Sequence, residues 1–232
     1  MKNLHLLLRL NNQQDLETLG RDLYRLASEA VAAHPGASTR LGLRDDLARE
    51  AAPYADVPEY DLALEFSVPE SESFDFLVEQ AKAVTPVIQP FIDPANSVAI
   101  AGKQNFLVPG EGQFQLFRSF GRLPELSQEQ FNSHFINIHS QFGIGLPGDP
   151  GYRQLHRDPE ATSQIREITG LTIVDNIDGV AQLLFASKDI IAGLGGNRER
   201  GEAAAKDGGL FIQRDSRRTI TSRLVLVAGP LF

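Results

Sequence analysis

The feature that most constrains this chain is the order of its apolar patterns, which runs twice through strand, helix, strand, strand, helix and strand. Short apolar or β-branched runs predict strands, whereas apolar residues at helical spacing predict helices. Pro86 is expected to bend or break the second helix. In the first half, the predicted strands are residues 3–10, 38–45, 60–68 and 97–108, and the predicted helices are residues 15–36 and 74–91.

The second half repeats this order after a linker at residues 108–113. Ser127 is expected to cap its first helix, with Gln130 at the capping-box position. Residues 166–174 are predicted to add a strand or hairpin. The remaining predicted strands are residues 113–120, 151–158, 178–187 and 217–227, and the remaining helical segments are residues 127–143, 188–194 and 201–211.

The two repeats of this order are offset by about 110 residues. Each has the element order of a ferredoxin-like βαββαβ unit. The sequence therefore predicts an α+β protein with two ferredoxin-like halves, residues 1–110 and 113–232. An apolar sheet face that no helix covers is unstable in water. We expect the two bare faces to pack together and close an α/β barrel within one chain.

Composition excludes several classes of function. The chain has 232 residues with a net charge of −8, which disfavours binding to nucleic-acid phosphates or to an anionic membrane surface. The absence of cysteine excludes disulfides, thiolate metal sites and cysteine nucleophiles. The apolar run at the start is interrupted by His5 and Arg9, so it does not resemble a signal peptide, and a cytoplasmic protein is expected.

Four segments of the second half, taken in order, resemble the EthD family of the dimeric α/β-barrel superfamily. The resemblance covers about residues 113–228, and the first half keeps the architecture without a histidine in the middle of its first helix. The segments are the helix with Phe131, Phe135 and His139, then Tyr152 to His156, then Asp178 to Ala181 running into Leu184 and Phe185, and finally Lys206 and Asp207 followed by Phe211.

The resemblance implies a small protein that acts without a cofactor on aromatic or polyketide-like molecules. Relatives of this kind decarboxylate anthraquinone-type acids, isomerise lactones or oxidise phenolic rings. It also implies that any site belongs to the second half and that the first half serves as scaffold.

One helical stripe contains Phe131, Phe135, His139 and Phe142. His139 would then be a neutral imidazole in an apolar pocket, where desolvation lowers its pKa and keeps it a base at neutral pH. The alternative is a core histidine bonded to a backbone carbonyl. His134 falls roughly 140° around the helical wheel from His139, so the two are not expected to face one target.

Strand alternation places Tyr152, Gln154 and His156 on one face of a predicted strand. Such a polar row is reasonable where it lines a cavity for a polar ligand, and the alternative is a solvent-facing strand edge. His139, His156 and Tyr152 are therefore the candidate catalytic residues, and Phe135, Phe142 and Gln154 are candidates for substrate binding.

Three further residues are candidates for binding substrate. Arg118 and Arg223 lie inside predicted strands, where a guanidinium needs a carboxylate or a ligand, although a structural salt bridge is an alternative. Asp178 precedes a strand and could orient a histidine, or it could simply form a turn with Gly179. The sequence contains no compact metal-ligand motif, so neither a metal nor a cofactor is expected.

Three functions are consistent with these residues. The first is a cofactor-independent lyase or isomerase acting on an aromatic or polyketide-like carbonyl compound, with His139 as base and Tyr152 or His156 as acid. The second is a cofactor-free monooxygenase of phenolic substrates, and the third is a non-catalytic small-molecule binding protein. The chain is expected to be a monomer with an internal pseudo-dimer or a homodimer.

Overall fold

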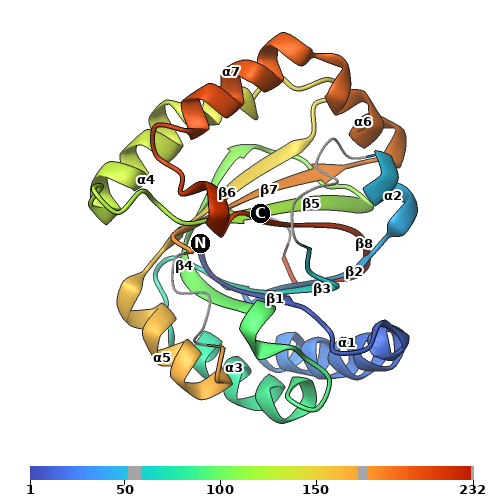
Figure 1. Ribbon diagram of the computed structural model, residues 1–232. Coiled ribbons are helices and arrows are strands. Elements are labelled where there is room, and N and C mark those ends of the chain that lie inside the picture. Colours follow the sequence, from blue (N-terminus) through green and yellow to red (C-terminus); the bar gives the residue numbers. More distant parts are fainter. Residues whose placement is uncertain (52–58, 172–176, 231–232) are drawn as a thin grey trace.

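A computed structural model describes residues 1–51, 59–171 and 177–230. Within these ranges, eight strands form a closed barrel in the order β1-β3-β2-β8-β5-β7-β6-β4, and every neighbouring pair is antiparallel. Helices surround the barrel (Figure 1). The α+β class and the barrel within one chain are therefore confirmed.

The strands agree closely with those expected from the apolar pattern. They are β1 (Lys2–Leu8), β2 (Ser38–Arg44), β3 (Leu62–Val68), β4 (Val98–Val108), β5 (Phe114–Phe120), β6 (Gly151–Arg157), β7 (Gly179–Phe185) and β8 (Arg218–Ala228). Going around the barrel, the first four strands follow the order β4-β1-β3-β2 and the last four follow the order β8-β5-β7-β6.

The helices include two that the apolar pattern did not indicate, α2 and α5. The α-helices are α1 (Leu16–Ala33), α2 (Asp46–Ala51), α3 (Asp75–Ile88), α4 (Gln128–Asn137), α5 (Pro159–Thr169), α6 (Lys188–Gly193) and α7 (Arg198–Gly208). The 3-10 helices are η1 (Gln13–Asp15), η2 (Pro94–Asn96), η3 (His139–Phe142), η4 (Leu194–Gly196) and η5 (Arg214–Ser216). No helix in the described ranges is long and apolar enough to cross a membrane.

The prediction of a strand or hairpin at residues 166–174 was wrong for its described part, which begins inside α5. Asp158 caps this helix by accepting a hydrogen bond from the Ala161 N–H at 3.0 Å, and Gly170 ends it at a φ of 70°. Residues 172–176 lie outside the described ranges. Pro86 does not break its helix, because α3 continues through this residue to Ile88, and the alternative of a bend stays a prediction.

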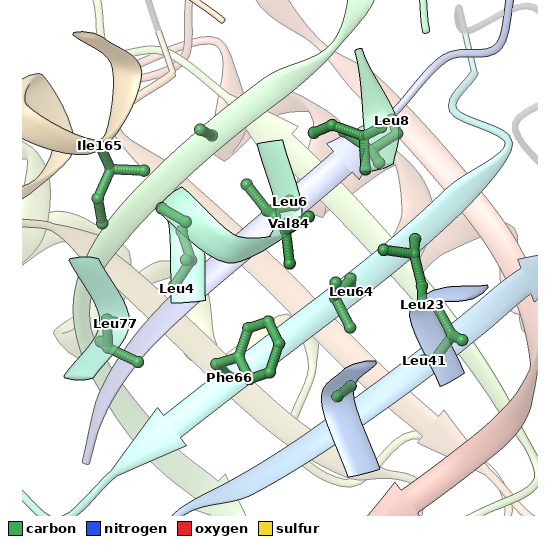
Figure 2. Close-up of a cluster of buried hydrophobic side chains, with 14 of the residues drawn as sticks. Leu4, Leu6, Leu8, Leu23, Leu41, Leu64, Phe66, Leu77, Val84 and Ile165 are labelled. Carbon is green, nitrogen blue, oxygen red and sulfur yellow. The ribbon is translucent and has the colours of Figure 1, made fainter. Parts of the chain in front are cut away.

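The outer face of the first four strands is packed with leucines beneath α1, α3 and α5 (Figure 2). Full burial of each leucine stabilises the fold by about 1.5–3 kcal/mol. Helix α5 belongs to the second half of the chain but packs on β4, where the Thr162 hydroxyl donates to the Ala101 carbonyl at 2.8 Å. The labelled side chains are Leu4, Leu6, Leu8, Leu23, Leu41, Leu64, Phe66, Leu77, Val84 and Ile165.

The opposite side of the barrel is covered by α4 and α7 (Figure 1). Here the core is aromatic and consists of Phe120, Phe131, Phe135 and Phe211. The two outer faces of one barrel therefore differ in chemistry, since the first is leucine-rich and the second is built on phenylalanine.

The two halves share an ion-pair arrangement at corresponding positions. Asp61 immediately precedes β3 and pairs with Arg44, the last residue of β2. Asp178 immediately precedes β7 and pairs with Arg157, the last residue of β6, at 3.2 Å. Both aspartates also accept a backbone N–H from the segment after the first strand of their half, from Leu10 and Arg122 respectively.

Candidate active site

Helix α4 begins as the sequence predicts. The Ser127 hydroxyl accepts from the Gln130 N–H at 3.1 Å and the Gln130 side chain accepts from the Ser127 N–H at 2.8 Å, which confirms the capping box. The helix ends at Asn137, earlier than expected. Ile138 departs from helical geometry with φ −115° and ψ −59°, and His139 then starts a 3-10 turn.

This early end brings the two histidines of the segment to one carboxylate. The His134 Nε2 lies 3.0 Å from Asp207 Oδ1, and the His139 Nδ1 lies 2.8 Å from Asp207 Oδ2. The expectation that these histidines could not face one target was wrong, because it assumed a continuous helix from 127 to 143. Asp207 belongs to α7, which packs against the turn.

His139 is surrounded by aromatic rings. Its ring centroid lies 6.2 Å from that of Phe135, 5.5 Å from that of Phe142 and 4.9 Å from that of Phe211. Burial lowers the pKa of His139 below its ordinary value, although the hydrogen bond and the charge of Asp207 oppose the shift. The imidazole is therefore neutral at pH 7.

The carboxylate oxygen of Asp207 accepts the hydrogen bond from His139, so the Nδ1 atom of His139 carries the proton in this pair. The Nε2 atom then holds the lone pair and is the basic atom. The side chain of His139 is 18% exposed, which leaves it partly accessible. This arrangement of a carboxylate behind a neutral histidine is suited to taking a proton from another molecule.

Tyr152, Gln154 and His156 lie on the outer face of β6, under α4. The Gln154 Nε2 donates to the Tyr152 hydroxyl at 2.6 Å and to the Phe135 carbonyl at 2.9 Å. The Gln154 Oε1 lies 3.1 Å from the His156 Nε2, which donates to it. These bonds use both donors of the Gln154 amide, so the side chain holds Tyr152 and His156 in place.

Tyr152 lies beside the turn that carries His139. Gly143 follows that turn, and a Cβ atom there would come within 2.4 Å of the Tyr152 ring, so the close approach requires glycine. Burial raises the pKa of Tyr152 to about 12, against the opposing effects of Gln154 and Arg118. Its hydroxyl therefore stays protonated at neutral pH and can donate a hydrogen bond.

His156 stacks on Phe135, with ring centroids 5.2 Å apart and an interplanar angle of 21°. Burial, with a smaller effect of Lys103, lowers the pKa of His156 to about 4. His156 is therefore neutral, and its Nε2 proton is donated to Gln154. Its contacts connect the polar row of β6 to the aromatic core.

Arg118 in β5 is aligned across the sheet with Ala181 in β7 and Gln154 in β6. Its positive charge acts on both His139 and Tyr152, as a secondary influence on the pKa of each. Ala181 lies between Arg118 and Gln154 in this alignment, and its small side chain fills little of the space between them. Arg118 is thus placed with the other candidate residues.

The structure places Arg223 and Asp178 elsewhere. Arg223 is aligned with Phe114 at the beginning of β5, its side chain is 62% exposed, and its Nε lies 3.9 Å from Asp45. Asp178 is buried in the ion pairs with Arg122 and Arg157. Neither is brought into the group around His139 and Tyr152.

Asp207 and Phe211 are the residues that reasoning from the sequence left without a role. Both belong to a segment already singled out by the EthD resemblance, which was the available signal. Arg200, also on α7, binds the end of the His139 turn, because it donates to the Gln141 carbonyl at 2.8 Å and to the Phe142 carbonyl at 3.3 Å. Helix α7 therefore binds the turn at two places, through Asp207 at His139 and through Arg200 at the carbonyls of Gln141 and Phe142.

The first half provides an internal comparison for this face. The strands β2 and β6 have equal lengths, and the second, fourth and sixth positions are Thr39, Leu41 and Leu43 in β2. At the same positions, β6 has the tyrosine, glutamine and histidine of the polar row. The fifth position is Leu6 in β1 and Arg118 in β5. At three of these four positions a polar side chain of the second half thus replaces a leucine of the first, and at the fourth Tyr152 replaces Thr39.

Within residues 1–51, 59–171 and 177–230, no group of three or more histidine, aspartate or glutamate side chains is arranged to hold a metal ion.

Comparison with solved structures shows the same fold in three bacterial proteins. A "putative monooxygenase" from Lactobacillus acidophilus has a TM-score of 0.55 at 10% identity, covering 98% of this chain and 95% of that one. A "putative monooxygenase" from Fusobacterium nucleatum has a TM-score of 0.56 at 7% identity, covering 98% and 93%. A dye-decolorizing peroxidase from Bacteroides thetaiotaomicron has a TM-score of 0.54 at 10% identity, covering 96% and 92%.

No protein-family model and no curated protein sequence matches the chain. The structural similarity extends over nearly the whole chain, so it includes both halves of the barrel.

Proposed function

We propose that this protein is an enzyme in which His139, supported by Asp207, removes a proton from an aromatic or polyketide-like carbonyl compound. The observation that carries this proposal is the contrast between the two outer faces. Three strand positions that hold Leu41, Leu43 and Leu6 in the first half hold a glutamine, a histidine and an arginine in the second, and Thr39 is replaced by a tyrosine. Buried polar groups weaken a core unless they have partners, so their presence on one side alone favours a functional role.

In this proposal the His139 Nε2 takes a proton from a carbon or a hydroxyl next to a carbonyl group. The resulting imidazolium is stabilised by the Asp207 carboxylate, which lies 2.8 Å from Nδ1. The Tyr152 hydroxyl donates a hydrogen bond to the substrate oxygen where negative charge develops, and the charge of Arg118 stabilises the same oxygen. Phe142, which is only partly buried, provides an aromatic surface for the substrate rings, and the fully buried Phe135 supports the site from the core.

An enolate formed in this way can lose water or be protonated at another carbon, whereas a β-keto acid would reach the same enolate by losing carbon dioxide in place of the proton. The proposed activity is accordingly that of a lyase or an isomerase. The names of similar structures favour a second candidate, since two of them are called monooxygenases. In that reaction the same base would form a phenolate that reacts with dioxygen, so that a ring methylene becomes a carbonyl and the second oxygen atom leaves as water.

The experiment measures proton exchange of the substrate and consumption of dioxygen in the same sample. Hydroxylated anthrones, anthraquinone carboxylic acids and unsaturated lactones are incubated with the protein in D₂O in a closed oxygen-electrode cell. Deuterium incorporation or product formation without oxygen uptake supports the lyase or isomerase, and stoichiometric oxygen uptake supports the monooxygenase. Both activities should disappear in His139→Ala and persist in His34→Ala, a matched change at a histidine of the first half.

Retained activity in His139→Ala would remove this residue from the mechanism. Binding of these compounds without exchange or turnover, and weakened by His139→Ala, would instead favour a small-molecule binding protein.

We also propose that the two halves are tandem ferredoxin-like repeats and that the second belongs to an EthD-like lineage. The matching strand orders and the equivalent Asp61 and Asp178 ion pairs support the first part. An internal barrel of this kind is compatible with a monomer, and sedimentation would distinguish it from a homodimer. A cytoplasmic location stays a prediction.

A further inference from the structure

The interior of the barrel contains a buried polar group at the end where β1 begins. His5 in β1 is aligned with Glu65 in β3, and Glu65 is aligned with Arg40 in β2. These three side chains are 0%, 1% and 4% exposed. The opposite end of the interior is apolar and includes Leu7, Ala63 and Val180 among its residues.

The second half contributes a matching row. Phe117, Gln182 and Arg153 occupy the positions in β5, β7 and β6 that correspond to His5, Glu65 and Arg40. The two rows meet inside the barrel, where the Gln182 Nε2 donates to Glu65 Oε1 at 2.8 Å. Two guanidinium groups, Arg40 and Arg153, are thereby directed into one interior.

A single carboxylate joins these arginines. The Arg40 Nη2 donates to Glu111 Oε1 at 2.9 Å, and the Arg153 Nη2 donates to the same oxygen. Glu111 lies in the linker between β4 and β5, and its side chain is 36% exposed. The flanking residues Gly110 and Gly112 approach the backbone at Gly151 and Phe185 so closely that neither could carry a Cβ atom. The linker backbone is thus held in place, while the Glu111 side chain can still reach solvent.

Several buried polar atoms around this group lack hydrogen-bond partners within the described structure. They are both ring nitrogens of His5, Glu65 Oε2, the Nε atoms of Arg40 and Arg153, Gln104 Oε1 and Gln115 Nε2. Of these, His5 Nε2 and Glu65 Oε2 lie 3.4 Å from each other without forming a hydrogen bond. Unpaired buried polar atoms are costly, so this many would remove a large part of the free energy of folding. A polar species bound among them would supply the missing partners.

The charges favour an anion. Two guanidinium groups face one Glu111 carboxylate, and burial raises the pKa of Glu65, which favours its neutral acid even though Arg40 and Arg153 oppose the shift. Burial also keeps His5 neutral, with a pKa of about 3. The interior therefore has an excess of positive charge and offers both donors and acceptors.

We propose that this end of the barrel interior is a second binding site, separate from the outer face, for a short-chain hydroxycarboxylate such as glycolate. The ligand carboxylate replaces that of Glu111 between Arg40 and Arg153, and its hydroxyl reaches His5 and Glu65. Glu111 shows that a carboxylate oxygen fits between the two arginines. The partly exposed Glu111 side chain is the part that moves aside to admit the ligand.

The experiment is a calorimetric titration of the full chain with sodium glycolate at pH 6, against sodium chloride at equal ionic strength. The Glu111→Gln variant should bind glycolate at least fivefold more tightly than the parent, because the competing carboxylate is gone while the side chain keeps its shape. Adding Arg153→Met or Arg40→Met to that variant should weaken binding at least tenfold. Thermal unfolding of each variant shows that it is folded before it is titrated.

Two control variants test whether glycolate binds inside the barrel and not elsewhere on the protein. Glu79→Gln, a change at an exposed glutamate of α3, should leave the affinity unchanged. His139→Ala should also leave it unchanged, so failure of the outer-face function and failure of this site are distinguishable. Equal affinity of the parent and Glu111→Gln, no binding to either, or soaked crystals with only ordered water among these side chains would overturn the proposal.

Discussion

Gln154 and Leu41 occupy the same position, the fourth residue of β6 and of β2, on the outer faces of the two halves of the barrel. Leu41 is buried in an apolar core, whereas Gln154 is equally buried but bonded to Tyr152, His156 and the Phe135 carbonyl. One backbone position thus serves packing in one half and a polar network in the other.

Two single variants, each of which introduces the residue of the other half, should affect different properties: one should lower activity and the other should lower stability. Gln154→Leu should leave the fold intact while lowering kcat/KM at least tenfold, because Tyr152 and His156 lose the side chain that orients them. Leu41→Gln should leave activity in place but lower the free energy of unfolding by about 1–3 kcal/mol, since it buries an amide without partners. Kinetics and urea denaturation of both variants check the pair, and equal loss of activity in both would contradict it.

Asp207→Asn should lower kcat by about 10²–10⁴, since the amide cannot stabilise the imidazolium or hold the required tautomer. Asp207 raises the pKa of His139 against the effect of burial, so its removal should move the pKa still lower. The acidic limb of the pH–rate profile should therefore shift to lower pH. A profile with an unchanged acidic limb would show that His139 is not the titrating base.

Phe135→Ala should lower the free energy of unfolding by about 3–5 kcal/mol, because the fully buried ring leaves a cavity among Phe120, Phe131 and Phe211. Phe142→Ala is the matched control, as this ring is only partly buried. Phe142→Ala should lower the free energy of unfolding by clearly less than Phe135→Ala. It should also weaken the binding of aromatic compounds. Urea titrations at pH 7.5 measure the difference, and equal losses would contradict the packing argument.

Acid should destabilise the protein below pH 6.5. The folded pKa of His5 is lowered to about 3 and that of His156 to about 4, so the unfolded chain takes up these protons first as the pH falls. The stability is fully present above pH 6.5 and declines toward pH 4, by about 1.4 kcal/mol per pH unit for each histidine. His5→Gln should therefore lose about 2 kcal/mol less than the parent between pH 7.5 and 5. Equal losses would show that His5 is protonated in the folded state.

Glu65→Gln copies the residue that Gln182 provides at the corresponding position of β7. Burial raises the pKa of Glu65, so its ionisation destabilises the folded state as the pH rises above its unfolded value. The variant should accordingly gain stability relative to the parent at pH 8, by about 1–3 kcal/mol, and much less at pH 5. Chemical denaturation at the two pH values tests this, and a loss of stability at pH 8 would show that the arginines need the charge.

The sequence by itself determined the strands and the starts of most helices, although its apolar pattern did not indicate α2 and α5. The period-two pattern of β6 sends Tyr152 and His156 to one face and Arg153 to the other, because successive side chains of a strand alternate. The start of α4 was equally predictable, since a capping box needs only Ser127 and Gln130. These features depend on neighbours within a few residues, and the residues themselves carry that information.

Only the tertiary structure decided which distant residues meet. His139 and Asp207 are 68 residues apart, and they meet because α4 stops at Asn137 and α7 returns across it. Helix α5 likewise lies on the sheet of the other half, where Thr162 bonds to Ala101. Such contacts depend on how the barrel closes and on which helices then cover each face, which is a property of the whole packed chain and not of any one segment.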